Sequence, residues 1–268
     1  MRIPISRTTC LALALVTVVS APALARDEAT RTGGSFLETF ADERLDRERW
    51  FVADGWVDTP DFDCAWSADA LRKVGDTLEF RIERRPTAER EFMCAQVQSV
   101  ELFHHGVFEA RLRAAEGSGL MSAFFTYTGP YFGDPHDEID IELPGARTRT
   151  VELNSWRDGS DGDGAIRLDV DFDVSAEFRD YAFEWTQDAV RFFVDGEQVG
   201  EITDAARIPQ APGKIYIVLY SGRARYDPWL GRFEEQDTPP TMVVERVAFT
   251  APGDDCQFPE SIVCGRER

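Results

Sequence analysis

Three carboxylates alternate with apolar residues in the segment HDEIDIELPG, residues 136–145. Glu138, Asp140 and Glu142 hold every second position, with isoleucine or leucine between them. In a β-strand, residues two apart lie on the same face, so the three acids would share one face and the apolar residues the other. Such a face could be a solvated surface, a cation site or a site for acid–base and nucleophilic catalysis.

The spacing alone does not choose among these readings. With 49 acids in 268 residues, chance gives roughly one or two such triplets per chain. The segment LDVDFDV has the same alternation, with Asp169, Asp171 and Asp173. We interpret LDVDFDV as a solvated strand face. A functional role for residues 136–145 therefore needs evidence other than the spacing of their acids.

The order Glu-Asp-Glu supplies a difference. Glycoside hydrolysis uses paired carboxyls, which stand about 5–5.5 Å apart in retaining enzymes. The Cα atoms of Glu138 and Glu142 lie roughly 13 Å apart in an extended strand, and glutamate side chains are long enough to converge over a sugar ring. Asp140 between them would disfavour ionisation of a neighbouring glutamate and keep one carboxyl protonated. The order therefore favours two-carboxylate catalysis.

A cation site is the second alternative. Calcium takes carboxylate oxygens, usually from loops, and DGSDGDGA (158–165) resembles such a loop. Counted from Asp158, position five is Gly162 and position six is Asp163, whereas an EF-hand requires glycine at position six. We interpret this segment as a turn.

Aromatic residues surround the acidic segment in the sequence. SAFFTYTGPYFGDP leads into it. Four further aromatic residues have polar neighbours and are candidates to stack on sugar rings, with core packing as the alternative: Trp56, Trp156, Tyr220 and Trp229. We assign Trp50 and Trp185 to the core.

Patterns with period two dominate the chain. GVFEARLRA and YAFEW alternate, GKIYIVLYSG is a continuous apolar run, and MVVERVAFT is a late strand. VRFFVDGEQVGEI predicts a hairpin around Asp195-Gly196. Many short strands with weak helical periodicity predict an all-β sandwich or barrel.

The first 25 residues resemble a secretory signal. Arg2 and Arg7 precede an apolar stretch, and Ala23–Ala25 form a small-residue cleavage site. A membrane anchor is the alternative, but the apolar stretch is shorter than the roughly 20 residues that span a bilayer. We expect cleavage after about Ala25 and a secreted or periplasmic protein without a membrane partner. Residues 26–251 are predicted to form one domain rather than two, and 252–268 a short tail.

The net charge is −20, or −22 without the two signal arginines. This charge argues against nucleic acid as a partner, because phosphate binding relies on lysine and arginine. It also disfavours tight binding to a densely anionic polymer. The simplest explanation of the negative charge is a solvated acidic surface.

Four cysteines remain after the signal, which contains Cys10: Cys64, Cys94, Cys256 and Cys264. An even number in an exported protein suggests disulfides, and the residues alone leave all three pairings open. Zinc is disfavoured because no C-x-x-C spacing occurs and the chain has only three histidines. We predict no metal site.

At this point the chain resembles glycoside hydrolase family 16, in its branch of bacterial lichenases (endo-β-1,3-1,4-glucanases) and exopolysaccharide endo-glycanases. The resemblance is carried by segments in the family's order between about residues 35 and 250: DCAWS, MCAQVQS, GSGLMSAFFTYTGP, HDEIDIELPG, YAFEW, FFVDG, PGKIYIVLYSG and DPWLG. It implies a concanavalin A-like jelly-roll β-sandwich with a concave substrate cleft. It also implies retaining, endo-acting hydrolysis of a polysaccharide with no required cofactor, and we expect a monomer.

The resemblance also implies residue roles. Glu138 matches the nucleophile, Glu142 the general acid/base and Asp140 the assisting carboxylate. Cys64 and Cys94 match a lichenase disulfide, which leaves Cys256 to pair with Cys264. Family members can bind a structural Ca²⁺ through backbone oxygens away from the cleft, a feature this sequence does not show.

The sugar-binding positions of the family match this sequence less well than the catalytic positions do. Residues that match in type, or nearly so, are Trp56, Phe125, Tyr127, Asn154, Trp156, Tyr220 and Trp229. Lichenases have tryptophan at His136, glutamate and arginine at Gln96 and Gln98, and asparagine at Val218. At these positions the chain is more similar to enzymes that trim secreted bacterial polysaccharides, such as succinoglycan-type chains. His136 has two readings: it contacts substrate or tunes Glu138, or it is a turn residue after Pro135.

Two other functions use the same features. A lectin-like sandwich would bind polysaccharide through the same aromatic residues without cutting it, although both catalytic glutamate positions are occupied here. A transglycosylase would differ in acceptor preference rather than in machinery.

Overall fold

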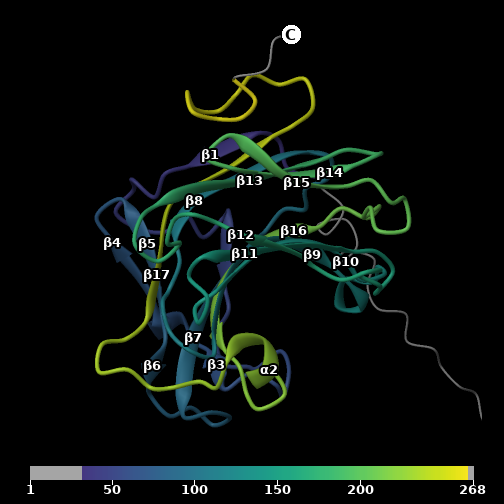
Figure 1. Cartoon of the computed structure of the whole chain (residues 1–268). Coiled ribbons are helices and arrows are strands. Elements are labelled where there is room, and N and C mark those ends of the chain that lie inside the picture. The colour runs from purple at the N-terminus through teal and green to yellow at the C-terminus, as the bar shows by residue number, and fades with distance from the viewer. Residues whose placement is uncertain (1–31, 265–268) are drawn as a thin grey trace, which may run out of the picture.

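Two antiparallel β-sheets stack face to face in the computed structural model, which describes residues 32–264 (Figure 1). Within these residues one sheet has eight strands and the other nine. The predicted all-β sandwich is thereby confirmed. The expected signal, residues 1–25, lies outside the described residues.

The eight-stranded sheet runs in the order β15 (Glu197–Ile202), β14 (Val190–Val194), β13 (Arg179–Trp185), β8 (Gly106–Arg113), β17 (Thr241–Thr250), β5 (Thr77–Arg81) and β4 (Leu71–Val74), with β1 (Phe36–Glu38) on β17. The nine-stranded sheet runs in the order β12 (Ile166–Asp169), β11 (Thr150–Trp156), β10 (Asp137–Pro144), β9 (Leu120–Thr128), β16 (Lys214–Ser221), β7 (Phe92–Ser99) and β2 (Trp50–Val52), with β3 (Cys64–Trp66) and β6 (Glu83–Arg84) on β7. The helical elements are α2 (Asp227–Leu230) and the 3₁₀ turns Ala68–Ala70 and Pro130–Phe132.

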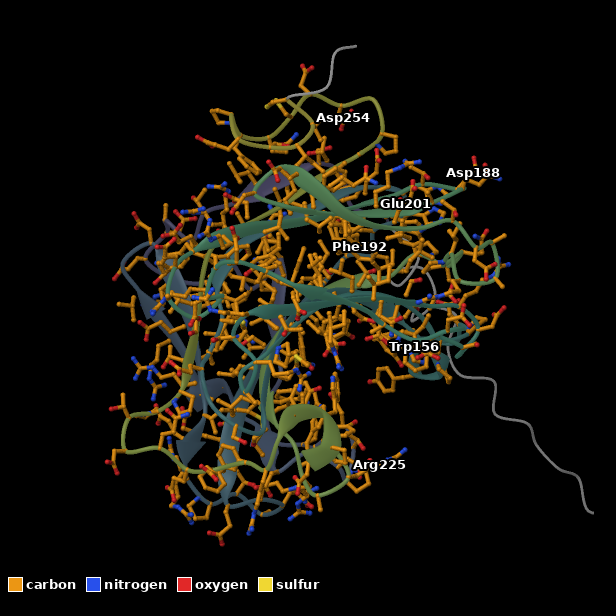
Figure 2. All side chains as sticks on the ribbon, viewed as in Figure 1. Trp156, Asp188, Phe192, Glu201, Arg225 and Asp254 are labelled. Atoms are coloured by element: carbon orange, nitrogen blue, oxygen red, sulfur yellow. A yellow bond between two sulfur atoms is a disulfide. The ribbon has the colours of Figure 1, made fainter. Side chains whose placement is uncertain are left out.

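The hydrophobic core lies between the sheets. Tyr181, Phe183 and Trp185 on β13 are at most 1% exposed, as the alternation in YAFEW predicts. Ile139 and Ile141 from β10 enter the same core from the other sheet. Figure 2 shows the side chains that fill this layer, Phe192 among them. One face of each strand is thus fixed by burial, which leaves the outer face of the nine-stranded sheet available for chemistry.

The predicted hairpin between β14 and β15 is confirmed. Asp195 has φ 48° and Gly196 has φ 83°. Two positive φ values suit a two-residue turn whose twist matches the flanking strands.

The prediction of a strand through LDVDFDV is wrong beyond its first residues. Strand β12 ends at Asp169. Asp173 instead accepts hydrogen bonds from Thr148 Oγ1 at 3.0 Å and from Ser175 Oγ at 2.6 Å. Asp173 therefore forms a turn held by side-chain hydrogen bonds instead of pairing in a strand, because aspartate readily bonds to neighbouring groups in the chain.

The C-terminal segment covers part of the eight-stranded sheet (Figure 1). Glu109 of β8 accepts hydrogen bonds from Ser261 Oγ at 2.7 Å and from Ile262 N at 3.0 Å. The Cys256–Cys264 disulfide closes this segment on itself. Glu109, which the alternation places on the outer face, is therefore buried, and burial raises its pKa.

No helix within residues 32–264 is long and apolar enough to cross a membrane.

Candidate active site

Strand β10 lies inside the nine-stranded sheet, between β9 and β11. Ile139, Ile141 and Leu143 pack into the core at 0–1% exposure. Glu138, Asp140 and Glu142 therefore project from the opposite face, the one on which Figure 2 places Trp156.

The register of β10 with β9 and β11 places predicted sugar-binding residues beside the acids. Glu138 pairs with Tyr127 on β9 and Trp156 on β11. Asp140 pairs with Phe125 and Asn154 in the same way. Directly opposed residues of neighbouring strands lie about 4.5–5.5 Å apart, so four of the expected sugar-binding residues contact the acid strand's flanks.

The carboxyls of Glu138, which is partly buried, and Asp140, which is buried, form a hydrogen-bonded pair. Burial raises the pKa of both, and the charge of Glu138 raises the pKa of Asp140 further. The indole N–H of Trp156 also bonds to Asp140. Burial raises the pKa of Glu138 to about 8 and that of Asp140 well above its usual range, so the pair shares a proton near neutral pH.

Glu142 is at the far end of the row of acids. Burial raises its pKa well above the usual range, and the charges of Asp140 and Glu152 raise it further. The site thus separates its carboxyls into one that can be ionised and one that holds a proton. This separation is what acid-assisted displacement at a glycosidic bond requires.

His136 lies against the acid strand. Its Nε2 is 2.6 Å from Glu138 Oε2. Its ring stacks on Trp156 with centroids 5.2 Å apart and meets the edge of Tyr127 at 5.3 Å. Burial lowers the pKa of His136, and in the tautomer with its proton on Nε2 the neutral imidazole donates this N–H to Glu138. The structure favours the reading in which His136 tunes Glu138.

Glu152 is a fourth carboxylate that the sequence analysis did not single out. It pairs with Glu142 across β10 and β11 and is 2% exposed. Its Oε1 accepts from Arg147 Nη2 at 2.7 Å and Arg167 Nε at 3.0 Å, and its Oε2 from Trp229 Nε1 at 2.7 Å. The alternation 152, 154, 156 in VELNSW could have placed it on the same face as Asn154 and Trp156.

Two adjoining cavities lie over the carboxyls, and Glu138 lines both. One, of about 930 Å³, extends over β2, β7 and β16, and its walls include Trp56, Tyr127 and Phe125. The other, of about 530 Å³, extends toward β11, β12 and α2 and has Phe125 and four further expected residues in its walls: Asn154, Trp156, Tyr220 and Trp229. We name them the β7 cavity and the β12 cavity. Together they form one cleft across the sheet.

Three of the four departures from the lichenase pattern line this cleft, and His136 lines neither cavity. Gln96 lines both cavities, Gln98 lines the β7 cavity and Val218 lines the β12 cavity. Gln96, Gln98 and Val218 therefore face the cleft in which a substrate would bind.

One wall of the cleft comes from a loop that sequence reasoning did not resolve. Asp58 accepts from Trp56 Nε1 and Trp66 Nε1, each at 2.8 Å. Phe62 stacks on Tyr220 with centroids 4.2 Å apart. The contacts of Asp58 lie within one short segment, whereas the stack of Phe62 on Tyr220 joins residues far apart in the chain, and none of them carries a periodic signal in the sequence.

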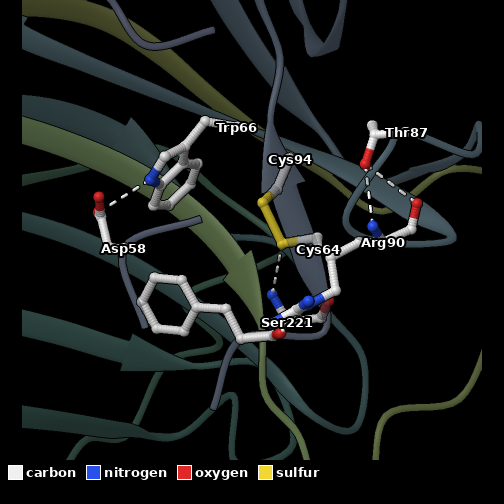
Figure 3. Close-up of a disulfide and its surroundings, with 8 residues drawn as sticks. Asp58, Cys64, Trp66, Thr87, Arg90, Cys94 and Ser221 are labelled. Atoms are coloured by element: carbon white, nitrogen blue, oxygen red, sulfur yellow. Dashed lines mark hydrogen bonds between the residues drawn. A yellow bond between two sulfur atoms is a disulfide. The ribbon is translucent and has the colours of Figure 1, made fainter. Parts of the chain in front are cut away.

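A disulfide anchors this wall (Figure 3). Cys64 on β3 bonds to Cys94 on β7, the pair that the resemblance implied. Cys64 Sγ also accepts from Ser221 N at 3.4 Å. The bond thus ties the loop carrying Trp56 and Phe62 to the sheet that carries the acids.

Among residues 32–264 no group of three or more histidine, cysteine, aspartate or glutamate side chains is arranged to hold a metal ion.

A cleft lined by a row of carboxyls on a β-sandwich is an arrangement that glycoside hydrolysis can use. Residues 58–238 match the model of glycosyl hydrolases family 16, and the chain belongs to that family. It is an endo-β-glucanase-like member.

Relatives of named activity support this class. The endo-1,3-1,4-β-glycanase ExoK of Rhizobium meliloti (strain 1021) is 42% identical over 87% of this chain and 85% of its own length. A β-glucanase of Brevibacillus brevis is 34% identical over 84% of this chain and 85% of its own length. The solved structure of Bacillus licheniformis β-glucanase superposes with a TM-score of 0.76 at 33% identity, covering 82% of this chain and 100% of that chain. The predicted jelly-roll fold is confirmed.

Proposed function

We propose that this protein is an exported, retaining endo-β-glycanase that hydrolyses β-1,3-1,4-linked glucan or a related bacterial exopolysaccharide. The observation that carries the proposal is the row of acids on β10. There a proton-sharing Glu138–Asp140 pair stands beside Glu142, whose raised pKa keeps it protonated.

The mechanism assigns each carboxyl one task. Glu138 attacks the anomeric carbon while Glu142 gives its proton to the departing glycosidic oxygen, so the C–O bond breaks as a glycosyl ester forms. Asp140 holds the shared proton and bonds to Glu138. Glu142, now ionised, takes a proton from water, which attacks the anomeric carbon and releases Glu138. Two inversions give net retention.

The direct test measures new reducing ends on barley β-glucan, lichenan, laminarin and succinoglycan. We expect cleavage of at least one polymer, and Glu138→Gln should lose at least about 10³-fold in kcat with an unchanged fold. Activity of Glu138→Gln at the wild-type rate would remove Glu138 from its role. Chain-length analysis separates hydrolysis from transglycosylation, which redistributes lengths with few new ends.

The proposal also includes the expectations on context. We propose that the protein acts as a monomer outside the cytoplasm and that its carboxyls need no cofactor. Full activity after dialysis against a chelator, with one monomeric species by light scattering, is the expected result.

A further inference from the structure

One arginine reaches the cleft. Among the described residues that line the β7 and β12 cavities, Arg167 is the single arginine or lysine. It lies on β12 opposite Glu152, which in turn lies opposite Glu142 on β10. Since strands are spaced about 4.8 Å apart, Arg167 is held roughly 10 Å from the backbone of Glu142, along the same row.

Glu152 does not neutralise both of its arginines. Its single charge meets Arg147 and Arg167, which leaves an excess of one positive charge. Arg147 is occupied further, because its Nη1 donates to the Trp229 carbonyl. Arg167 bonds through Nε alone within residues 32–264, and its side chain is 59% exposed. Its two terminal amino groups are therefore directed by the Glu152 anchor and remain able to bind a ligand.

The position of Arg167 fixes which half of a substrate it would meet. Glu142, Glu152 and Arg167 line the β12 cavity and not the β7 cavity. The half of the chain that leaves receives its proton from Glu142, so it occupies the β12 cavity. The half that becomes attached to Glu138 extends into the β7 cavity.

We propose that Arg167 binds a carboxylate carried by the leaving half of the polysaccharide. The inference rests on the proposed function and names its substrate class as a glycan with sparse carboxylate groups. A guanidinium presents paired N–H donors that match a carboxylate, which a neutral glucan would not use. The net charge of the chain and the other acids that line the β12 cavity, Asp161 among them, oppose densely anionic polymers, so the carboxylates must be sparse.

The test compares polymers that carry acidic or neutral groups. Barley β-glucan is esterified with succinate or, at equal substitution, with acetate, and a third sample is oxidised at C6 to glucuronate. At low ionic strength we expect kcat/KM to be about three- to tenfold higher on the succinylated or the oxidised polymer than on the acetylated one. The two acidic samples distinguish an acyl carboxylate from a uronate.

Variants assign the preference to Arg167. Arg167→Gln should abolish the preference, measured as the ratio of kcat/KM on the succinylated polymer to kcat/KM on the acetylated one, and Arg167→Lys should keep part of it. Arg191→Gln is the matched control, because Arg191 also bonds to a glutamate through Nε, at 2.7 Å to Glu201, but lies on the eight-stranded sheet. It should retain the wild-type preference.

Product mapping by mass spectrometry supplies the decisive readout. Acidic substituents should be enriched near the new non-reducing ends, which come from the leaving half. Equal enrichment at both new ends, or an undiminished preference in Arg167→Gln, would overturn the proposal.

A binding measurement separates this proposal from the proposed function. Calorimetry on Glu138→Gln, with and without Arg167→Gln, compares the succinylated and acetylated polymers without turnover. If no glucan is cut, the proposed function fails. A binding preference that disappears with Arg167→Gln still supports the carboxylate site, and equal binding overturns it.

Discussion

His136 Nε2 lies 2.6 Å from Glu138 Oε2, while the imidazole stacks on Trp156 at an interplanar angle of 13°. Asp140 bonds to the same Glu138 carboxyl. Two donors thus favour the ionised form of Glu138, and burial opposes it. This balance decides how readily the proposed nucleophile loses its proton.

Replacing His136 by phenylalanine should keep the stack on Trp156 and remove the donor. The ionised form of Glu138 is then less stable, so its pKa rises and the acid limb of the kcat/KM profile moves to higher pH. We expect kcat to fall about tenfold, the effect of losing a hydrogen bond to a charged group. His136→Gln, which keeps a donor, should lie between this variant and wild type. An acid limb that stays in place in His136→Phe would contradict the tuning role.

Glu142→Gln should stabilise the fold while abolishing hydrolysis of unactivated glucan. The pKa of Glu142 is raised on folding, so the unfolded chain releases this proton first as pH rises. The folded state therefore loses stability between about pH 4.3, the ordinary glutamate value, and the raised pKa. Glutamine does not ionise, so Glu142→Gln keeps this stability as pH rises.

Thermal unfolding at several pH values checks this. We expect Glu142→Gln to exceed wild type by about 2–4 °C in Tm at pH 7.5 for each kcal/mol gained, with the difference shrinking toward pH 4. Asp171→Asn, an exposed acid in the LDVDFDV segment, serves as the control and should show no such pH trend. A constant Tm difference across the range would exclude the ionisation of Glu142 as its cause.

Glu152→Gln should shift the alkaline limb of activity. The charge of Glu152 raises the pKa of Glu142, so its removal lowers that pKa, and Glu142 loses its catalytic proton at lower pH. Glutamine can still accept from Trp229 Nε1, which keeps that contact. Kinetics from pH 5 to 9 should show the alkaline limb displaced downward. An upward displacement would contradict the electrostatic argument.

The two disulfides should differ in their effect on substrate binding. Removing the Cys64–Cys94 bond as the double serine variant opens a loop of 30 residues, which costs about 3–4 kcal/mol in chain entropy. It also loosens the wall that carries Trp56, so KM should rise. The double serine variant of Cys256 and Cys264 opens a loop of 8 residues on the far sheet, with a cost of about 2–3 kcal/mol and an unchanged KM. Denaturant unfolding and β-glucan kinetics on both variants check this, and equal KM values would refute the proposed link.

Much of the strand pattern could be predicted because burial imposes period two. The faces of β10 and β13 followed from alternation, and the β14–β15 hairpin followed from Asp195-Gly196. The LDVDFDV prediction failed because side-chain hydrogen bonds at Asp173 end the strand, and alternation alone cannot detect them. Glu109 reads as exposed in the sequence, yet a tail more than 140 residues away covers it.

The sequence by itself determined the acid face, because alternate residues on a strand must share a side and the intervening isoleucines must be buried. It also singled out some of the aromatic residues that line the cleft, Trp156 and Trp229 among them. Only the tertiary structure decided that Glu152 and Arg167 continue the row from Glu142, because register between strands is set by packing between sheets and leaves no mark in local spacing. The same holds for the contact of His136 with Glu138, which depends on how the ring packs between Trp156 and Tyr127.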